Sequence, residues 1–307
     1  MTKVLVATEK PFAAVAVDGI RKVVEEAGFE LALLEKYASR DELLKAVADA
    51  DAIIIRSDKD GEDVFAAAPG LKIVVRAGAG YDNVDLAAAT AHDVVVENTP
   101  GQNSNAVAEL ALGMMVMAAR NSYDGTSGTE LSGKTLGIQA FGQVGRNVAR
   151  IAKGFGMHVS AVDPYCPAEV IEAAGVKVCG TVADLYRNNK YVSVNIPATP
   201  ETVKSIGYDL LVSMPKGGVV VNTARKEVID EAGLAKALDE RIDLKYFADV
   251  KPDTADELTA RFGNRVFFTP KKMGAQTAEA NINAGIAAAR QIVAYFKEGC
   301  ERFRVNK

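Results

Sequence analysis

Residues 134–163 read KTLGIQAFGQVGRNVARIAKGFGMHVSAVD, and this stretch decides the fold of the chain. Thr135–Gln139 is a short apolar run typical of a buried strand. Residues 140–145 form a glycine-containing turn, and a helical pattern leads to a second strand that ends at Asp163. Glycines in such a turn let the backbone approach a pyrophosphate closely, and the helix N-terminus presents amides to its charge. The order of these elements predicts a dinucleotide site.

Individual residues of this motif predict the type of cofactor. Asp163 stands about 20 positions after the turn, where an acid accepts hydrogen bonds from ribose hydroxyls and repels a 2′-phosphate, which favours NAD over NADP. Ala140 occupies the position of the first glycine, so we expect it to keep a negative φ. The motif's predicted cofactor-binding residues are Ala140, Gly142, Gln143, Val144, Gly145, Asp163 and Pro164.

The same alternation of strand and helix patterns extends over nearly the whole chain. Ala-rich helical segments separate further β-branched runs, which are typical of βαβ units and parallel sheets. A chain of 307 residues is long enough for two cores with a cleft between them. The fold class is therefore expected to be α/β with two doubly wound parallel sheets. The further predicted strands are residues 4–7, 52–56, 73–76, 94–96, 159–163, 191–196 and 218–222.

Composition excludes several classes of protein. Hydrophobic residues make up 49% and charged residues 25%, which is typical of soluble globular proteins, and no apolar run reaches the roughly 20 residues of a membrane span. The N-terminus MTKVLVATEK indicates a strand instead of a secretion signal, so a cytoplasmic location is expected. A net charge of -4 argues against a nucleic-acid partner. Cys166, Cys179 and Cys300 lack the spacing of a disulfide framework or zinc site, so no metal is predicted.

Seven ordered segments carry a resemblance to a known family. They are RSD from Arg56, VRAGAGYDNVDLAAA from Val75, NTPGQNSNAVAEL from Asn98, GKTLGI from Gly133, VNIPATPET from Val194, MPKGGVVVNTAR from Met214 and TPKKMGAQTAEAN from Thr269. With them the chain resembles the D-2-hydroxyacid dehydrogenases, and most closely short 3-phosphoglycerate dehydrogenases that end after the catalytic core, without a serine-sensing domain.

The resemblance implies one domain for the substrate and one for the cofactor. A flavodoxin-like substrate domain would comprise residues 1–97 and 283–307, and a Rossmann cofactor domain residues 98–282, with the site in the interdomain cleft. A helix from about residue 103 to residue 120 would form the crossover and part of a homodimer interface through the cofactor domain.

The resemblance also implies roles for particular residues. Arg225 matches the family's catalytic arginine, whose bidentate donors can hold a substrate carboxylate and polarise the C2 carbonyl. Backbone amides of residues 77–80 would receive the carboxylate, and Arg56 and Arg76 would supply cations for a phosphorylated substrate. The other implied substrate-binding residues are Ser57, Ala77, Gly78 and Asn103. The other implied cofactor contacts are Ile196, Pro197, Thr202, Thr223, Ala224, Asp249 and Gly274.

The chain departs from the family at the acid/base pair. The family's histidine is replaced by Lys271 or Lys272, and Thr254 has the spacing of its glutamate. Counting back from Gly274 selects Lys272, which we favour, whereas counting forward from Pro270 selects Lys271. A histidine with a pKa of about 6.5 needs a nearby carboxylate to stay protonated at neutral pH. A lysine, with a pKa of about 10.4, is already protonated there and can act as an acid. Reduction is therefore expected to be the easier direction.

The sequence predicts an NAD-dependent oxidoreductase that moves a hydride between the cofactor and C2 of 3-phosphoglycerate or 3-phosphohydroxypyruvate, in serine biosynthesis. One alternative is a dehydrogenase of an unphosphorylated 2-hydroxyacid, of the glyoxylate or hydroxypyruvate type. Another is an NADH-sensing binding protein with vestigial catalysis, an idea that the missing histidine and glutamate keep open.

Overall fold

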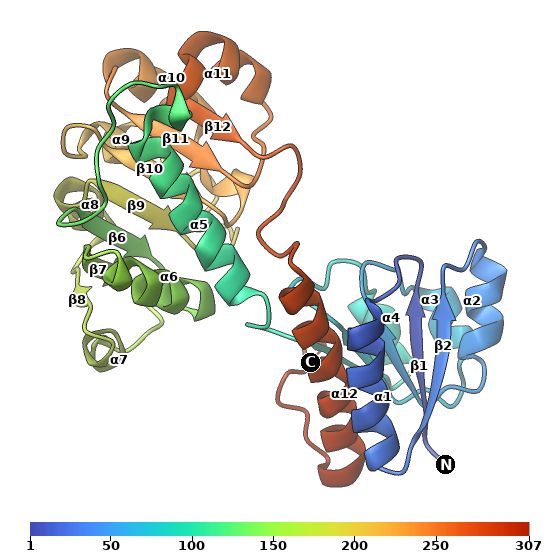
Figure 1. Cartoon of the computed structure of the whole chain (residues 1–307). Helices are drawn as coiled ribbons and strands as arrows, with labels where there is room; N and C mark the ends of the chain where they lie inside the picture. Colours follow the sequence, from blue (N-terminus) through green and yellow to red (C-terminus); the bar gives the residue numbers. More distant parts are fainter. Residues whose placement is uncertain (307) are drawn as a thin grey trace. The chain divides into compact units, whose positions relative to one another are not determined.

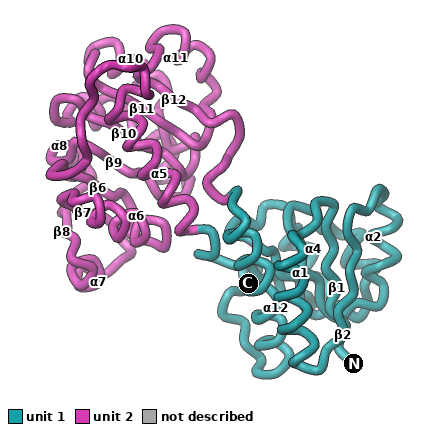
Figure 2. Tube along the Cα trace, in the orientation of Figure 1, with its two compact units in different colours: residues 1–103, 276–307 teal, residues 104–275 magenta. Residues whose placement is uncertain are grey.

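A computed structural model describes residues 1–306, which divide into two compact units (Figures 1 and 2). Unit 1 is formed by Met1–Asn103 and by the segment from Gln276 onward, and unit 2 by Ser104–Ala275. The chain thus passes between the units after Asn103 and after Ala275. The boundaries predicted from the sequence lie after residues 97 and 282.

Unit 1 is built on a parallel five-stranded sheet with the order β2-β1-β3-β4-β5, which is the flavodoxin-like order. Its strands are β1 (Lys3–Thr8), β2 (Glu30–Glu35), β3 (Ala52–Ile55), β4 (Ile73–Arg76) and β5 (Val95–Asn98). Its helices are α1 (Ala14–Glu26), α2 (Arg40–Val47), α3 (Glu62–Ala67), α4 (Leu86–Ala91) and α12 (Ala278–Glu298).

Both faces of this sheet are covered by helices. Val4 and Val6 of β1 are buried in a cluster with residues of α1 and α12. Leu5 and Ala7 are buried in a second cluster with residues of α2, α3 and α4. Because alternate residues of a strand point to opposite faces, continuous apolar strands are what a sheet covered on both sides requires.

Helix α12 returns from the far end of the chain to pack against α1 in unit 1 (Figure 1). The two helices approach closely at Gly19, where an added Cβ would lie 2.6 Å from Cδ1 of Ile286. Ala288, Ala289 and Ile292 complete the core on this face of the sheet. Neither α12 nor any other helix within residues 1–306 is both long and apolar enough to cross a membrane.

Unit 2 is built on a parallel seven-stranded sheet with the order β12-β11-β10-β9-β6-β7-β8. Its first six strands in chain order follow the doubly wound dinucleotide-binding arrangement, with β12 added at one edge. The strands are β6 (Thr135–Gln139), β7 (His158–Val162), β8 (Lys177–Val178), β9 (Tyr191–Val194), β10 (Val219–Asn222), β11 (Lys245–Ala248) and β12 (Val266–Phe268). The α-helices are α5 (Ser104–Ala119), α6 (Gln143–Gly154), α7 (Ala168–Ala173), α8 (Val182–Asn188), α9 (Tyr208–Val212), α10 (Glu231–Glu240) and α11 (Ala255–Phe262).

The predicted fold class is confirmed, and each strand predicted from the sequence is present. The long helix expected near residues 103–120 is α5, and the C-terminal helical run is α12. Four strands escaped prediction, namely β2, β8, β11 and β12. Strand β2 is the clearest case, because it lies at the sheet edge and all six of its residues are at least partly exposed.

Candidate functional site

The carboxyl ends of the strands in unit 2 gather most of the predicted cofactor and catalytic residues. In a doubly wound sheet ligands bind outside these ends, where the strand order reverses, and here the reversal lies between β6 and β9. The motif turn follows β6, Ile196 and Pro197 follow β9, and residues 223–225 follow β10. Asp249 follows β11, and the two lysines follow β12.

The turn after β6 presents backbone amides at the start of α6. Gly142 is the N-cap residue of α6 and receives no side-chain cap. The first-turn amides, including those of Gln143 and Val144, therefore have no acceptor within the helix and face the position of an anion. Gly145 is buried, and an added Cβ there would lie 2.3 Å from the carbonyl oxygen of Ala140. A glycine is consequently required at residue 145 for the helix to pack against the turn.

Ala140 contradicts the expectation of a negative φ, because its φ is 75°. Its amide donates to the carbonyl of Val162 at 2.9 Å, which fixes the residue at the end of the sheet while the chain turns sharply into α6. A left-handed conformation costs a residue with a Cβ roughly 1–2 kcal/mol relative to glycine. The first position of the turn therefore has the left-handed backbone conformation that favours glycine, although the residue there is Ala140.

Asp163 is tied to the motif turn by its carboxylate. Its Oδ2 accepts the amide of Phe141 at 2.7 Å, and its Oδ1 accepts the amide of Tyr165 at 2.8 Å. A carboxylate has about four acceptor positions, so it can still accept hydrogen bonds from a diol. The arrangement fits an adenosine ribose held beside the turn.

Other predicted cofactor residues differ in what their side chains do. Thr223 is 5% exposed, and its hydroxyl has no partner among residues 1–306, which is a position that a bound polar group would satisfy. Thr202 instead uses its hydroxyl internally, donating to the carbonyl of Pro197 at 2.6 Å. The amide of Ala224 donates to Oδ1 of Asn222 at 2.9 Å.

Arg225 lies on an exposed turn that Asn222 holds in place. The Asn222 side chain is completely buried, and its Nδ2 donates to the carbonyl of Arg225 at 2.9 Å. The Arg225 guanidinium itself donates only to the neighbouring carbonyl of Ala224, at 3.0 Å, as far as the described residues go. Its remaining donors are available for an anion.

Lys271 and Lys272 lie in the segment between β12 and α12, and both residues are exposed. The buried Asp249 holds the chain on either side of them. It accepts hydrogen bonds from the Thr269 hydroxyl before them and from the Gly274 amide after them.

The two arginines predicted for substrate binding in unit 1 have different surroundings. Arg56 donates to the carbonyls of Lys10 and Pro11 and to Oδ1 of Asn281, and its guanidinium lies 5.1 Å from the ring centre of Phe12. Its charge is therefore already solvated by the protein.

Arg76, at the end of β4, is much less satisfied. Its Nε is buried without a partner, and Nη1 reaches only the carbonyl of Ala77, at 3.5 Å. Burial, followed by the nearby charge of Arg56, lowers the pKa of Arg76, and Asp82 opposes this. No carboxylate among residues 1–306 forms an ion pair with it, so an anion from outside would stabilise this guanidinium.

Of the four backbone amides of residues 77–80 that were predicted for the substrate carboxylate, two are already bonded within the protein. The amide of Ala77 donates to Ile55 and that of Gly78 to Arg76, each at 2.8 Å. Within residues 1–306, no acceptor is found for the amides of Ala79 and Gly80. The amides open to a carboxylate are thus those of the second half of the loop.

Comparison with known proteins decides the family. The model of the D-isomer-specific 2-hydroxyacid dehydrogenase NAD-binding domain matches residues 88–270, more than half of the chain. The chain belongs to the D-2-hydroxyacid dehydrogenase family. The matched region contains the motif turn, Asp163, Arg225 and Asp249, and most of unit 2 lies within it.

Several curated proteins that are similar to this chain carry the name D-3-phosphoglycerate dehydrogenase. The protein of Methanocaldococcus jannaschii is 37% identical over 290 residues, which cover 88% of this chain and 54% of the relative. An Arabidopsis thaliana chloroplastic protein is 38% identical, covering 87% of this chain and 45% of its own. The chain therefore spans about half the length of the curated relatives it matches.

Solved structures are similar over the full length. NAD+-bound 3-phosphoglycerate dehydrogenase of Entamoeba histolytica is 45% identical with a TM-score of 0.84, covering 100% of this chain and 99% of that one. D-lactate dehydrogenase of Escherichia coli is 26% identical with a TM-score of 0.77, covering 99% of this chain and 100% of that one.

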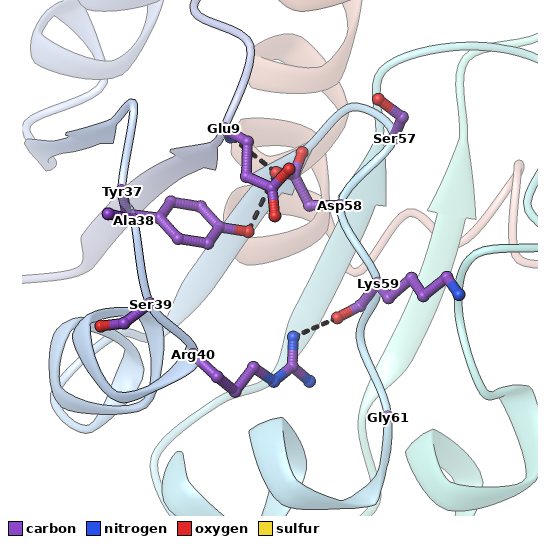
Figure 3. A pocket seen from close by; sticks show the side chains of 9 residues that line it. All are labelled: Glu9, Tyr37, Ala38, Ser39, Arg40, Ser57, Asp58, Lys59 and Gly61. Atoms are coloured by element: carbon purple, nitrogen blue, oxygen red, sulfur yellow. Dashed lines mark hydrogen bonds between the residues drawn. The ribbon is translucent and has the colours of Figure 1, made fainter.

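Unit 1 also contains a cavity of about 540 Å³ at the carboxyl ends of β1 and β3 (Figure 3). Ser57 lines this cavity, but the charged groups of the cavity are largely paired within the protein. Asp58 accepts the Tyr37 hydroxyl at 3.0 Å, and Arg40 donates to the Lys59 carbonyl (Figure 3). Arg40 also donates to Asp63. The sequence analysis did not identify this cluster, because its pairs join residues about 20 positions apart.

Because of Asp60, in the same loop, we expect the free energy of unfolding to depend on pH. The residue is 2% exposed, neither carboxylate oxygen has a partner among residues 1–306, and burial raises its pKa to about 7. Between the unfolded pKa near 4 and about 7, only the unfolded chain releases the proton, so stability falls as pH rises through this window and then levels off.

We expect Asp60→Asn to remove this dependence. At pH 8 the variant should be more stable than the parent by up to roughly 4 kcal/mol, since each pKa unit corresponds to about 1.36 kcal/mol, and at pH 4 the two should be nearly equal. Urea unfolding at both pH values, followed by circular dichroism, measures the difference. Asp18→Asn, on an exposed face of α1, is the control. An equal effect of Asp60→Asn at both pH values would contradict the prediction.

Proposed function

We propose that the chain is an NAD-dependent oxidoreductase acting at C2 of a phosphorylated 2-hydroxyacid, with 3-phosphoglycerate and 3-phosphohydroxypyruvate as its substrate pair. The observation that carries the phosphorylated substrate is Arg76, a largely buried guanidinium without an anionic partner, beside a loop with open amides. Phosphate is the ligand whose charge and geometry suit such a guanidinium. The names of the relatives support the same substrate class.

Unit 2 contains the groups that would hold the cofactor. The first-turn amides of α6 would receive the pyrophosphate and Asp163 the adenosine ribose, while the unpartnered Thr223 hydroxyl would gain a hydrogen bond. NAD, when bound, accepts or supplies the hydride. The protein contributes orientation and charge around it.

The protein's own groups then handle the substrate. Arg225 would hold the carboxylate and polarise the C2 carbonyl through its forked donors, which its exposed and lightly bonded guanidinium leaves available. In unit 1, the amides of Ala79 and Gly80 are candidates for the carboxylate and Arg76 for the phosphate. Lys272, with Lys271 as the alternative, would give a proton to the C2 oxygen during reduction and take it back during oxidation.

A substrate panel tests the proposal. NADH oxidation is measured with 3-phosphohydroxypyruvate, hydroxypyruvate, glyoxylate and pyruvate, for the parent chain and for Arg76→Lys and Arg76→Met. We expect Arg76→Met to raise KM for 3-phosphohydroxypyruvate by about 10- to 100-fold, in line with a lost charged hydrogen bond, and to leave KM for hydroxypyruvate within about threefold. Arg76→Lys keeps the charge and should lie between.

Arg21→Met, which removes an exposed arginine of α1, is the matched control. Equal effects of Arg76→Met on both substrates, or a parent chain that prefers hydroxypyruvate or glyoxylate, would favour the unphosphorylated alternative. NADH binding without turnover on any of the four ketoacids would favour the sensor.

A further inference from the structure

We propose that Asp249 is a positioning residue that holds the lysine segment, residues 269–274, through its carboxylate. The inference deepens the proposed function, because the segment contains both candidate proton donors. The family resemblance predicted Asp249 only as a contact of the cofactor. Its hydrogen bonds within the chain point to a further role.

The carboxylate of Asp249 is completely buried and bonded on both oxygens. Oδ1 accepts the amide of Met273 at 2.7 Å, and Oδ2 accepts the amide of Gly274 at 2.7 Å. The hydroxyl of Thr269 lies 3.0 Å from both Oδ1 and the backbone carbonyl oxygen of Asp249, which share its single proton. Two of these bonds have the short length of charge-assisted hydrogen bonds, which are about twice as strong as neutral ones. The carboxylate is therefore a firm point of attachment.

These three donors enclose the two lysines in the sequence. Thr269 precedes Lys271 and Lys272, and Met273 and Gly274 follow them directly, so the three residues 270–272 are tied on both sides to Asp249. Both lysines are exposed, so their own burial does not fix the loop. The carboxylate supplies that constraint.

Asp249 is in turn fixed to the sheet. Its amide donates to the carbonyl of Asn222 at 3.0 Å, and the Thr269 amide donates to the carbonyl of Ala248 at 3.1 Å. Asn222 also holds the Arg225 turn. The rigid ends of β10, β11 and β12 thereby set the positions of both proposed catalytic segments, which is how functional groups on loops gain precision.

Gly274 is suited to this contact by its missing side chain. A Cβ at residue 274 would lie 3.0 Å from Oδ2 of Asp249 and 3.1 Å from Cγ2 of Val107. The glycine lets its amide reach the carboxylate in a buried place. Three of the roughly four acceptor positions of the carboxylate are used and Asp249 has no exposed surface, so its side chain is committed to the lysine segment.

Asp249→Asn tests the inference. Asparagine has the same shape but a single acceptor oxygen, so it cannot accept on both sides, and the 273–274 amides lose a bond. We expect their hydrogen exchange in the cofactor-free chain to become at least about tenfold faster. We also expect kcat for reduction to fall about 10- to 100-fold, since misplacing a catalytic group by about 1 Å can cost 10²-fold. The Kd for NADH, measured by fluorescence, should change less than about threefold.

A double-variant cycle adds a readout that a merely structural role would not move. If Asp249 acts through the lysine, the double variant should be about as slow as Lys272→Met alone, because Asp249→Asn costs nothing further once the lysine is gone. Asp256→Asn, with a side chain that is 95% exposed, is the matched control. Gly274→Ala is the second variant in case Asp249→Asn does not fold. It keeps the charge, crowds the contact, and should accelerate the same exchange.

Unchanged hydrogen exchange at residues 273–274, together with an NADH Kd that rises in step with the fall in kcat, would overturn the positioning role of Asp249. Its only role would then be the contact with the cofactor. Failure of the proposed mechanism has another signature. If Lys271→Met and Lys272→Met both keep full activity, the lysine chemistry is wrong, whereas the exchange result still decides whether Asp249 holds the segment.

Discussion

Arg225→Gln is expected to lower kcat/KM for 3-phosphohydroxypyruvate by about 10³-fold or more. Two charge-assisted hydrogen bonds contribute about 1.5–3 kcal/mol each, and each 1.4 kcal/mol is a factor of about ten. The side chain is exposed and its donors reach only the Ala224 carbonyl within residues 1–306, so stability should change little. Steady-state kinetics of NADH oxidation, with urea unfolding in parallel, measures both quantities.

Arg225→Lys separates charge from geometry. Lysine keeps the charge but loses the planar fork, so it should recover only part of the loss. Arg187→Gln, which changes an exposed side chain of α8 in the same unit, should leave activity unchanged. If Arg225→Gln retained more than a tenth of the parent kcat/KM, the arginine would not hold the substrate.

Lys272→Met is expected to reduce kcat for ketoacid reduction by about 10²- to 10⁴-fold, the usual contribution of a general acid. Methionine keeps the length of the side chain and removes the proton, so NADH binding should be preserved. Lys271→Met, in the same exposed segment, is the matched comparison and should stay within a few-fold of the parent chain. Stopped-flow reduction with saturating NADH measures the chemical step.

The pH profile gives the sharpest reading of the lysine. In the parent chain the rate of reduction should depend on whether the donor carries its proton, so it should change with pH, and Lys272→Met should abolish that dependence. A profile governed by a group near about 6.5 in both proteins would point to an imidazole instead. Reversed results for the two lysines would keep the chemistry and move it to Lys271.

The sequence predicted those parts of the fold in which local pattern and burial agree. Strands such as Val219–Asn222 lie in the sheet interior and read as continuous apolar runs, because helices cover both faces. Strand β2 lies at an edge and carries Glu30 and Glu35 at its ends, so it lacks that pattern. Its pairing with β1 depends on the tertiary structure and cannot be read from the local sequence.

Site residues were predicted by type and position, but not by their surroundings. Arg56 and Arg76 look alike in sequence, yet Arg56 is bonded to Asn281, 225 positions away, and Arg76 retains an unpartnered Nε. Ala140 was expected to have a negative φ, and the turn it must make after β6 overrides that local preference. The bonds of Asp249 to residues 273 and 274 likewise depend on β11 and β12 lying side by side.

The late return of α12 to unit 1 has a consequence for synthesis on the ribosome. Val4, Val6 and Ile20 emerge early, but Ala288 and Ile292, which cover them, are translated only after all of unit 2. At about 5–20 residues per second, this apolar face stays uncovered for tens of seconds. Nascent unit 1 should therefore be a client of chaperones that bind exposed apolar segments, while unit 2, continuous in sequence, can complete its core first.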